Sequence, residues 1–370
     1  MTQTPTHRLA VFIGRFQPVH DGHVAVLEDL AGRVDSALVL VGSSYRARSW
    51  KNPFTYDERK AFLAEATADL DLPVRVLPLV DTLYDDRAWA ANVRTAVKIH
   101  MTRAGLDPHT TEVVLAGFDK DKSTRYLAWF PEWTAEPTDP VRRGGAMLNA
   151  TDFRSAVFLE ETDTSDLAGR FGAANAARVR RWAHENPEAV SRIREEGVFI
   201  RDYQARTAAA EAAFGYPIPV NTADAVVVQS GHILMVERAA LPGRGLWALP
   251  GGHLGRDETA LDAAIRELYE ECRLDMPKGA MRSRLRDRRV FDHPERSERG
   301  WVRTEAFLFE LQDRAELERV RASSDAADAF WVPITELTPE RMFEDHWDIV
   351  QTLVHGVPFA YTSILMAQAD

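Results

Sequence analysis

Two histidines three residues apart follow the first apolar run of the chain, in the sequence FIGRFQPVHDGH. His20 and His23 come after Gly14 and Arg15, where a strand would lead into a helix. A glycine there lets a phosphate approach the backbone, a helix N-terminus offers free amides, and imidazoles can donate hydrogen bonds to phosphate oxygens. The arrangement indicates phosphate positioning, which is the main requirement of nucleotidyl transfer. The simpler alternative makes the two histidines a turn and a helix cap.

A second group of ionisable side chains lies in LPGGHLGRDETALDAAIRELYEEC. Glu267, Glu270 and Glu271 are three and four residues apart, so on a helix their carboxylates share one face. Such crowding of negative charge is costly unless a cation binds, and Mg²⁺ or Mn²⁺ suits an all-oxygen site that also contacts phosphate. A solvated Glu/Arg helix is the alternative, which the preceding Gly-Gly loop disfavours. The residues that make up the complete motif are Gly252, Glu258, Arg266, Glu267, Glu270 and Glu271.

The elements that would position the first group alternate regularly. Strand-length apolar runs at 9–13, 37–41, 74–80 and 113–116 alternate with helix-like stretches near 24–33, 57–69 and 88–103. This alternation predicts an α/β, Rossmann-like domain with a doubly wound parallel sheet. In such sheets ligands bind at the carboxyl ends of the strands, so the residues directly after each strand are the candidates.

The second half of the chain has a different pattern. Residues 170–216 have helical spacing and are rich in Ala, Arg and Glu, and GYPIPV at 215–220 interrupts them. Strand-like runs at 223–229, 233–237 and 304–311 surround a strong helix at 257–273, which predicts an α+β domain. We therefore expect a first domain at 1–170, a helical extension and linker at 171–220, and a second domain at 221–370.

The N-terminal motif resembles the HxGH signature of the nucleotidyltransferase superfamily, in the form typical of archaeal-type nicotinamide mononucleotide (NMN) adenylyltransferases. GSSYRARSWKNPFTYDER resembles the family's KNPFT…ER segment, and NATDFR resembles its Thr-x-x-Arg motif, with Asn149 in place of the commoner Ser. The resemblance implies transfer of AMP from ATP to NMN, with His20 and His23 contacting the triphosphate. The residues that it implies for ATP and NMN binding are Gly14, Arg15, Phe16, Lys51, Asn52, Arg59, Trp89, Asn92, Gly117, Asp119, Thr151 and Arg154.

Two of these implied contacts have ordinary alternatives. Trp89 matches a family tryptophan that stacks on the cationic nicotinamide ring, which is favourable, yet a lone tryptophan is more often part of a core. Gly117 and Asp119 follow the fourth strand and either line the adenosine or phosphate side or form an ordinary loop. No general base is needed, because the phosphate of NMN is already ionised when it attacks.

The carboxylate helix resembles the Nudix box. The resemblance implies that Glu267, Glu270 and Glu271 ligate the metal, that one of them could double as a base, and that Arg266 orients a glutamate by ion pairing. Arg273 stands where the family pattern has glycine, two residues beyond the last glutamate. Glycine usually serves the turn after the helix, so we expect this departure to affect local geometry more than metal binding.

The segment FDHPERSERGW at 291–301 resembles part of the Nudix enzymes that split ADP-ribose into AMP and ribose 5-phosphate. Arg296 and Arg299 could face a diphosphate there, with Gly252 in the same site, or they could belong to a charged hairpin tip. The two sets of motifs, in this order, resemble the bifunctional NMN adenylyltransferase/Nudix hydrolase family. That resemblance implies NAD synthesis in the first domain and Mg-dependent ADP-ribose hydrolysis in the second.

Composition limits the other classes of function. The formal net charge of −11 argues against broad nucleic-acid binding, and no apolar run is long enough to cross a membrane. No export signal is visible, and the single cysteine, Cys272, suits a reducing compartment. We expect a cytoplasmic enzyme whose partners are ATP, NMN, NAD and ADP-ribose, and homo-oligomerisation stays open.

Two alternative functions remain at this point. The His-x-Gly-His motif marks transfer chemistry better than acceptor identity, so the acceptor could differ from NMN. The second domain could be a sensor that binds ADP-ribose without cutting it. The retained glutamates and the lack of a basic helix-turn-helix candidate argue against the sensor.

Overall fold

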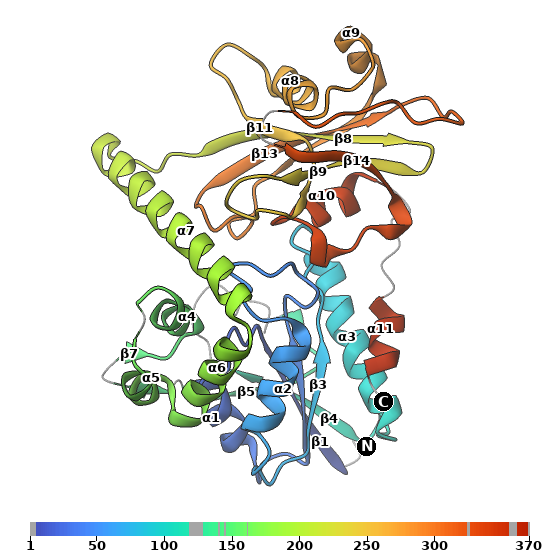
Figure 1. The fold of residues 1–370 in the computed structure, drawn as a ribbon. Coiled ribbons are helices and arrows are strands. Elements are labelled where there is room, and N and C mark those ends of the chain that lie inside the picture. Colours follow the sequence, from blue (N-terminus) through green and yellow to red (C-terminus); the bar gives the residue numbers. More distant parts are fainter. Residues whose placement is uncertain are drawn as a thin grey trace. The chain divides into compact units, whose positions relative to one another are not determined.

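The computed structural model describes residues 5–117, 129–139, 141–143, 146–160, 162–323, 326–354 and 361–368. The chain divides into two compact units (Figure 1): Met1–Arg194 with Ala360–Asp370 form the first, and Glu195–Phe359 form the second. The expected helical extension at 171–220 is therefore shared between the units. The last described helix belongs with the first unit, although it follows the second unit in the sequence.

The first unit is built on five parallel strands in the order β3-β2-β1-β4-β5. Consecutive residues of the two central strands β1 and β2 are buried, which is typical of a parallel sheet covered on both faces. This confirms the Rossmann-like prediction. The fifth strand was not predicted, because its sequence TAEP has no apolar run. The strands are β1 (His7–Gly14), β2 (Ser36–Val41), β3 (Val74–Pro78), β4 (Thr111–Gly117) and β5 (Thr134–Pro137).

The helices of the first unit begin close to their expected positions. For example, Thr55 caps the second helix: its hydroxyl accepts from the Glu58 amide at 3.3 Å, and the Glu58 carboxylate accepts from the Thr55 amide at 2.7 Å. A short ladder of β6 (Arg142–Arg143) and β7 (Ala146–Met147) precedes α4. The helices are α1 (Asp21–Leu30), α2 (Tyr56–Ala66), α3 (Asp86–Arg103), α4 (Ala150–Phe158), α5 (Thr164–Phe171), α6 (Ala173–Glu185), α7 (Pro187–Phe214), which continues into the second unit, and α11 (Tyr361–Gln368).

The second unit contains a seven-stranded mixed sheet with the main order β10-β9-β8-β13-β12, to which β11 adds beside β8 and β14 beside β9. β13 pairs with β8 in parallel, and the other pairs are antiparallel. The strands are β8 (Val220–Gln229), β9 (His232–Arg238), β10 (Trp247–Ala248), β11 (Gly251–His253), β12 (Leu285–Phe291), β13 (Val302–Glu310) and β14 (Ala326–Pro333). The helices are α8 (Ala260–Cys272), α9 (Lys278–Met281) and α10 (His346–Leu353).

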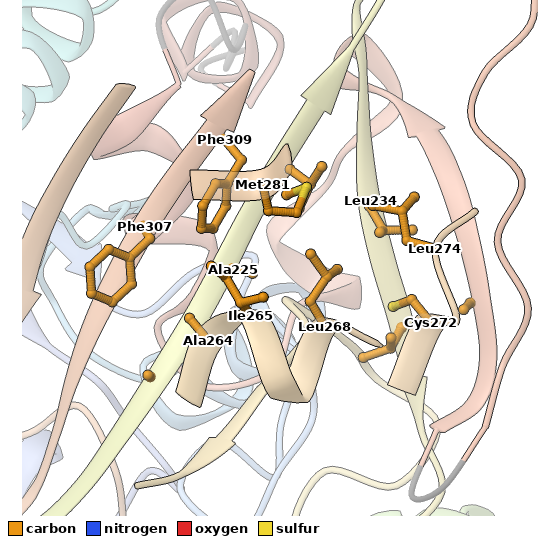
Figure 2. Packing of buried hydrophobic residues seen from close by; sticks show 14 of the residues in the cluster. Ala225, Leu234, Ala264, Ile265, Leu268, Cys272, Leu274, Met281, Phe307 and Phe309 are labelled. Carbon is orange, nitrogen blue, oxygen red and sulfur yellow. The ribbon is translucent and has the colours of Figure 1, made fainter. Parts of the chain in front are cut away.

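Helix α8 packs one apolar face onto this sheet (Figure 2). Ala264, Leu268 and Cys272 are fully buried at intervals of four residues, and they lie against Phe307, Phe309 and other buried side chains of the core. Burial of this face fixes the rotation of the helix, and the rotation decides where the glutamates on its other side stand. Within the part of the chain that the structure describes, no helix is long and apolar enough to cross a membrane.

Candidate active sites

The first candidate site lies where the direction of the strand order reverses. β1 has β2 and β3 on one side and β4 and β5 on the other, so the reversal falls between β1 and β4. Gly14 ends β1 and Gly117 ends β4 at the same edge of the sheet. In open α/β sheets this crevice is the usual place for a nucleotide.

The two histidines are stacked at this edge, at the start of α1. Their ring centroids are 3.8 Å apart, and His20 is the N-cap residue of the helix. His23 Nδ1 accepts a hydrogen bond of 3.3 Å from the His20 amide, which places the proton of the neutral ring on Nε2. Gly22 permits the stack, because a Cβ there would lie 3.0 Å from the His20 ring. The histidines thus cap the helix with their rings side by side, and their role as phosphate donors stays a prediction.

The Phe16 ring packs against one member of this pair, His23. Its ring lies 4.7 Å from that of His23, it is 1% exposed, and its φ of 53° is in the left-handed region. A Cβ at Gly14 would lie 2.9 Å from the Phe16 ring, so Gly14 is needed for this packing as well as for access to the backbone. Phe16 is therefore placed to position His23, and Arg15 beside it is exposed.

Two arginines expected among the ligand contacts are buried and hold backbone carbonyls instead. Arg59 is 1% exposed and donates to the carbonyls of Arg15, Gly42, Ser43 and Thr55 at 2.7 to 3.1 Å. Burial lowers its pKa to about 10, so the guanidinium stays charged at neutral pH. These contacts join the loops that follow β1 and β2, which favours a positioning role for Arg59.

Arg154 is 2% exposed and acts in the same way on the loop before α1. It donates to the Gln17 carbonyl at 2.9 Å and to the Thr151 hydroxyl at 3.2 Å. Asn149 replaces the commoner serine without loss of the helix cap, because its Oδ1 accepts from the Asp152 amide at 2.8 Å. Thr151 is exposed in the first turn of α4, where it could reach a ligand.

Sequence reasoning missed Asp81 and Ser43, which join the ends of β3 and β2. The Asp81 carboxylate accepts from the Ser43 amide at 3.1 Å and from its hydroxyl at 2.6 Å. Gln17 was also missed: it is 1% exposed and exchanges two hydrogen bonds with the Phe54 backbone. These three residues could have been found from the sequence, because each is a polar residue shortly after a strand, where ligand-binding residues were expected.

The other expected ligand residues are placed as follows. Trp89 is half-buried on α3, with its ring 5.8 Å from that of Trp129. Asn92 is half-buried one turn further along the helix. Lys51 and Asn52 are half-buried before α2, and the buried Oδ1 of Asn52 has no hydrogen-bond partner within the described residues. Asp119 lies outside the described residues.

The second candidate site is organised by Arg266 on α8. It donates to Glu258 at 2.7 and 3.0 Å, to Glu267 at 2.8 Å, to Glu270 at 2.9 Å and to the His253 carbonyl at 3.1 Å. These hydrogen bonds, that with Glu258 above all, raise its pKa. Arg266 thus links two glutamates of the helix to the preceding loop, an arrangement compatible with the orienting role predicted for it.

Glu271 stands apart from that network and is half-buried. Successive helical residues are rotated by about 100°, which puts Glu271 beside the apolar face and Glu270 furthest from it. Glu271 Oε2 accepts from the Gly251 amide at 3.1 Å. Burial, together with the nearby Glu267, raises its pKa to about 8. Asp224 on β8, which sequence reasoning missed, is also buried here and has a pKa raised by burial to about 6.

These carboxylates fit a divalent cation by their chemistry. Among the described residues no group of three His, Cys, Asp or Glu side chains is already arranged to hold a metal ion, and Arg266 binds Glu267 and Glu270. With a pKa of about 8 the Glu271 carboxyl is mostly protonated at neutral pH, and a bound cation would stabilise its ionised form. Gly252 leaves room for the Glu267 side chain, because a Cβ at residue 252 would lie only 2.4 Å from Glu267 Oε1.

Arg296 and Arg299 lie in the connection between the antiparallel strands β12 and β13, as the hairpin alternative expected, but neither side chain is exposed. Arg296 is 5% exposed and forms two hydrogen bonds of 2.9 Å with the fully buried Asp345. Arg299 is largely buried too and donates to Glu344 at 3.0 Å. Both arginines therefore fasten the 291–301 segment to residues 344–345, and a diphosphate contact by either of them stays a prediction.

Arg273, which stands where the family pattern has glycine, ends α8. It is the C-cap of α8 with φ 40° and ψ 50°, the left-handed conformation that favours glycine. Its amide still donates to the Tyr269 carbonyl at 3.2 Å. The helix therefore ends as it would with glycine, at the cost of a strained backbone.

Comparisons with known proteins match both units of the chain. The family model described as cytidylyltransferase-like matches residues 11–112, and the NUDIX domain model matches residues 219–353. Fold and sites together define a nucleotidyltransferase-type domain joined to a Nudix domain.

Relatives make the family more specific. A nicotinamide/nicotinic acid mononucleotide adenylyltransferase of Acinetobacter baylyi is 31% identical over 149 residues, which are 40% of this chain and 74% of that protein. A nicotinamide-nucleotide adenylyltransferase of Methanoculleus marisnigri is 42% identical over 84 residues, 23% of this chain, and the chain spans about half (49%) of its length.

One solved protein matches both units. The crystal structure of a bifunctional NMN adenylyltransferase/ADP ribose pyrophosphatase from Francisella tularensis is 28% identical, covers 95% of this chain and 100% of its own, and has a TM-score of 0.82. A second structure of that protein, complexed with AMP and a manganese ion, has the same identity and coverage and a TM-score of 0.80. The chain belongs to the bifunctional NMN adenylyltransferase/Nudix hydrolase family.

Proposed function

We propose that the chain makes NAD and pyrophosphate from NMN and ATP in its first unit and hydrolyses ADP-ribose to AMP and ribose 5-phosphate in its second. The observation that carries this proposal is the likeness to the Francisella protein, which extends over both candidate sites. The stacked histidines and the Arg266 network each supply the groups that one of the two reactions needs.

In the first reaction a phosphate oxygen of NMN attacks the α-phosphorus of ATP, and the bond to pyrophosphate breaks. The nucleophile is already ionised, so the chain has to position the two substrates and neutralise charge on the phosphates. His20 and His23, at the helix N-terminus, are the proposed donors to the triphosphate, and Trp89 is the proposed stacking partner of the nicotinamide ring.

In the second reaction water attacks one phosphorus of the diphosphate, and the bond from that phosphorus to the bridging oxygen breaks, which releases AMP and ribose 5-phosphate. Mg²⁺ or Mn²⁺ held by Glu267, Glu270 and Glu271 would supply charge neutralisation and an activated water. Arg266 orients two of these carboxylates and Gly252 leaves room for Glu267, so both act through the ligands rather than on the substrate.

The test is product analysis of the pure full chain with Mg²⁺. NAD should form from ATP plus NMN, and AMP should form from ADP-ribose. Pantetheine phosphate serves as a competing acceptor, because a product from it and none from NMN would contradict the proposed acceptor. Binding of ADP-ribose without release of AMP at any Mg²⁺ or Mn²⁺ concentration would instead support a sensor.

Two substitutions assign the reactions to the units. His23→Ala should lower NAD formation by about a hundredfold or more while hydrolysis of ADP-ribose is retained. Glu271→Gln should lower hydrolysis by about a hundredfold or more while NAD formation is retained. His109→Ala and Glu310→Gln, both at exposed positions, are matched controls expected to change neither rate. Loss of both activities in either active-site variant would contradict independent sites.

We further infer a reducing compartment, the cytoplasm, for this chain. Its single cysteine, Cys272, is fully buried in the core of the second unit. The net charge of −11 supports small nucleotides rather than nucleic acids as partners.

A further inference from the structure

The last helix of the chain, α11, packs on the first unit although it follows the Nudix domain in the sequence. Tyr361 and Leu365, one helical turn apart, are 7% and 0% exposed, whereas Met366 is 42% exposed. Figure 1 shows α11 beside α3. Arg103, the last residue of α3, donates to the Met366 carbonyl at 3.4 Å. One face of α11 is therefore part of the core of the first unit.

α11 runs antiparallel to β3, the edge strand of the parallel sheet. At its start the Tyr361 hydroxyl donates to the Pro78 carbonyl at 2.9 Å, and at its end the Gln368 carbonyl accepts from Arg75. Seven helical steps and three strand steps each span about 10 Å, so the two contacts match in length. Lys60 on α2 also donates to the Gln368 side chain at 3.0 Å. The outer edge of β3 is thus held by a helix from the far end of the chain.

The Tyr361 contact lies where β3 leads into the first candidate site. Directly after Pro78, the Leu79 amide donates to the Val41 carbonyl at 2.8 Å, and the Leu79 carbonyl accepts from Ser44 at 3.1 Å. Two residues further, Asp81 holds Ser43 through two hydrogen bonds. The position of the end of β3 therefore sets the position of the loop after β2.

That loop adjoins the phosphate-binding edge and is strained. Ser43 and Tyr45 have φ values of 49° and 63°, which residues with a side chain adopt only when their surroundings hold them there. The Gly42 amide donates to the Gly14 carbonyl at 2.8 Å, and Arg59 binds the carbonyls of Gly42 and Arg15. A continuous set of hydrogen bonds thus runs from Tyr361 to the loop that carries His20 and His23.

We propose that Tyr361 is a positioning residue for adenylyl transfer and that α11 is a working part of the adenylyltransferase unit. The inference rests on the proposed function of that unit. On this arrangement the Nudix domain is inserted into the adenylyltransferase domain, and the first activity requires residues that follow the second domain.

The test uses full-length Tyr361→Phe, which keeps the packing and removes the hydrogen bond. The turnover number for NAD formation at 25 °C should fall about fivefold, with smaller changes in KM for ATP and NMN, as expected for loss of one hydrogen bond. ADP-ribose hydrolysis should stay unchanged. Tyr56→Phe is the matched control: it removes a similar bond, 3.3 Å to the Val76 carbonyl, away from the end of the strand. Met366→Ala controls for substitution on α11 itself.

A chain that ends after residue 360 tests the contribution of the whole helix α11. It should lose NAD formation more than tenfold and retain hydrolysis. Equal turnover numbers for wild type, Tyr361→Phe and Tyr56→Phe would overturn the proposal, as would a lower melting temperature without a change in turnover number. Parallel loss of both activities would also overturn it. Absence of NAD formation by the wild type would instead refute the proposed function.

Discussion

At the scale of single residues, space beside a carboxylate matters as much as charge. Gly252→Ala would place a Cβ 2.4 Å from Glu267 Oε1, so Glu267 would have to move away from Arg266. We expect hydrolysis of ADP-ribose to fall about tenfold or more with NAD formation unchanged, because the disturbed group supports the metal ligands. Gly279→Ala is the control, since a Cβ there meets nothing within 4 Å. Steady-state kinetics of ADP-ribose hydrolysis by both variants test this prediction, and similar hydrolysis rates for Gly252→Ala and Gly279→Ala would contradict it.

His346 makes the stability of the second unit depend on pH. It is buried, and its Nδ1 accepts from the Leu249 amide at 2.9 Å, just before the Gly-Gly loop. Burial lowers its pKa to about 3; nearby Asp345 opposes the shift, and Arg296, Arg238 and Arg299 add to it. As the pH falls, His346 is therefore protonated near pH 6.5 in the unfolded state but only near pH 3 in the folded state.

The stabilisation is thus fully present above pH 6.5 and is lost as the pH falls from there toward 3. At pH 5 the free energy of unfolding of the second unit should be lower by about 2 kcal/mol from this group alone. Urea unfolding at pH 7.5 and pH 5 measures the difference. His346→Asn, whose side-chain oxygen can still accept from Leu249, should reduce that difference, and an unchanged difference would contradict the assignment.

At the scale of the element, the end of α8 is the place where substitution should stabilise the fold. Arg273 adopts a left-handed conformation that costs a residue with a side chain about 1–2 kcal/mol. Arg273→Gly should therefore raise the free energy of unfolding by about 1 kcal/mol, less the greater chain entropy of glycine. Arg273→Ala retains the strain and should give no gain. Thermal unfolding compares the stability of the wild type and the two variants. An alanine variant more stable than the wild type would show that the arginine side chain, rather than the backbone conformation, causes the destabilisation.

At the scale of the whole molecule, the two units should respond to different ligands. A ligand at a hundred times its dissociation constant stabilises the unit that binds it by about 2.7 kcal/mol. NMN should slow hydrogen exchange in β1–β4, and Mn²⁺ should slow it in α8 and the strands around it. Glu271→Gln should abolish only the effect of Mn²⁺. If either ligand protected both units equally, the two sites would be coupled.

The sequence by itself determined the class of fold and the two chemistries. Strand-length apolar runs depend on local periodicity, and the HxGH and Nudix spacings place His20 and His23, and likewise Glu267 and Glu271, on single turns of helix. The strands 9–13, 37–41, 74–80 and 113–116 all lie within or overlap the observed β1 to β4. Local sequence patterns suffice to predict strand positions and motif spacings, because each of these depends only on a short segment of the chain.

Only the tertiary structure decided which arginines are available to a ligand and which residues complete each unit. Arg59, Arg154 and Arg296 have carbonyl or carboxylate partners from distant segments, and a charged residue type does not reveal such partners. The docking of α11 on β3 joins residues nearly 300 positions apart, which no local pattern encodes. The physical reason is that burial and pairing of polar groups are properties of the packed chain, whereas periodicity and spacing are properties of the segment.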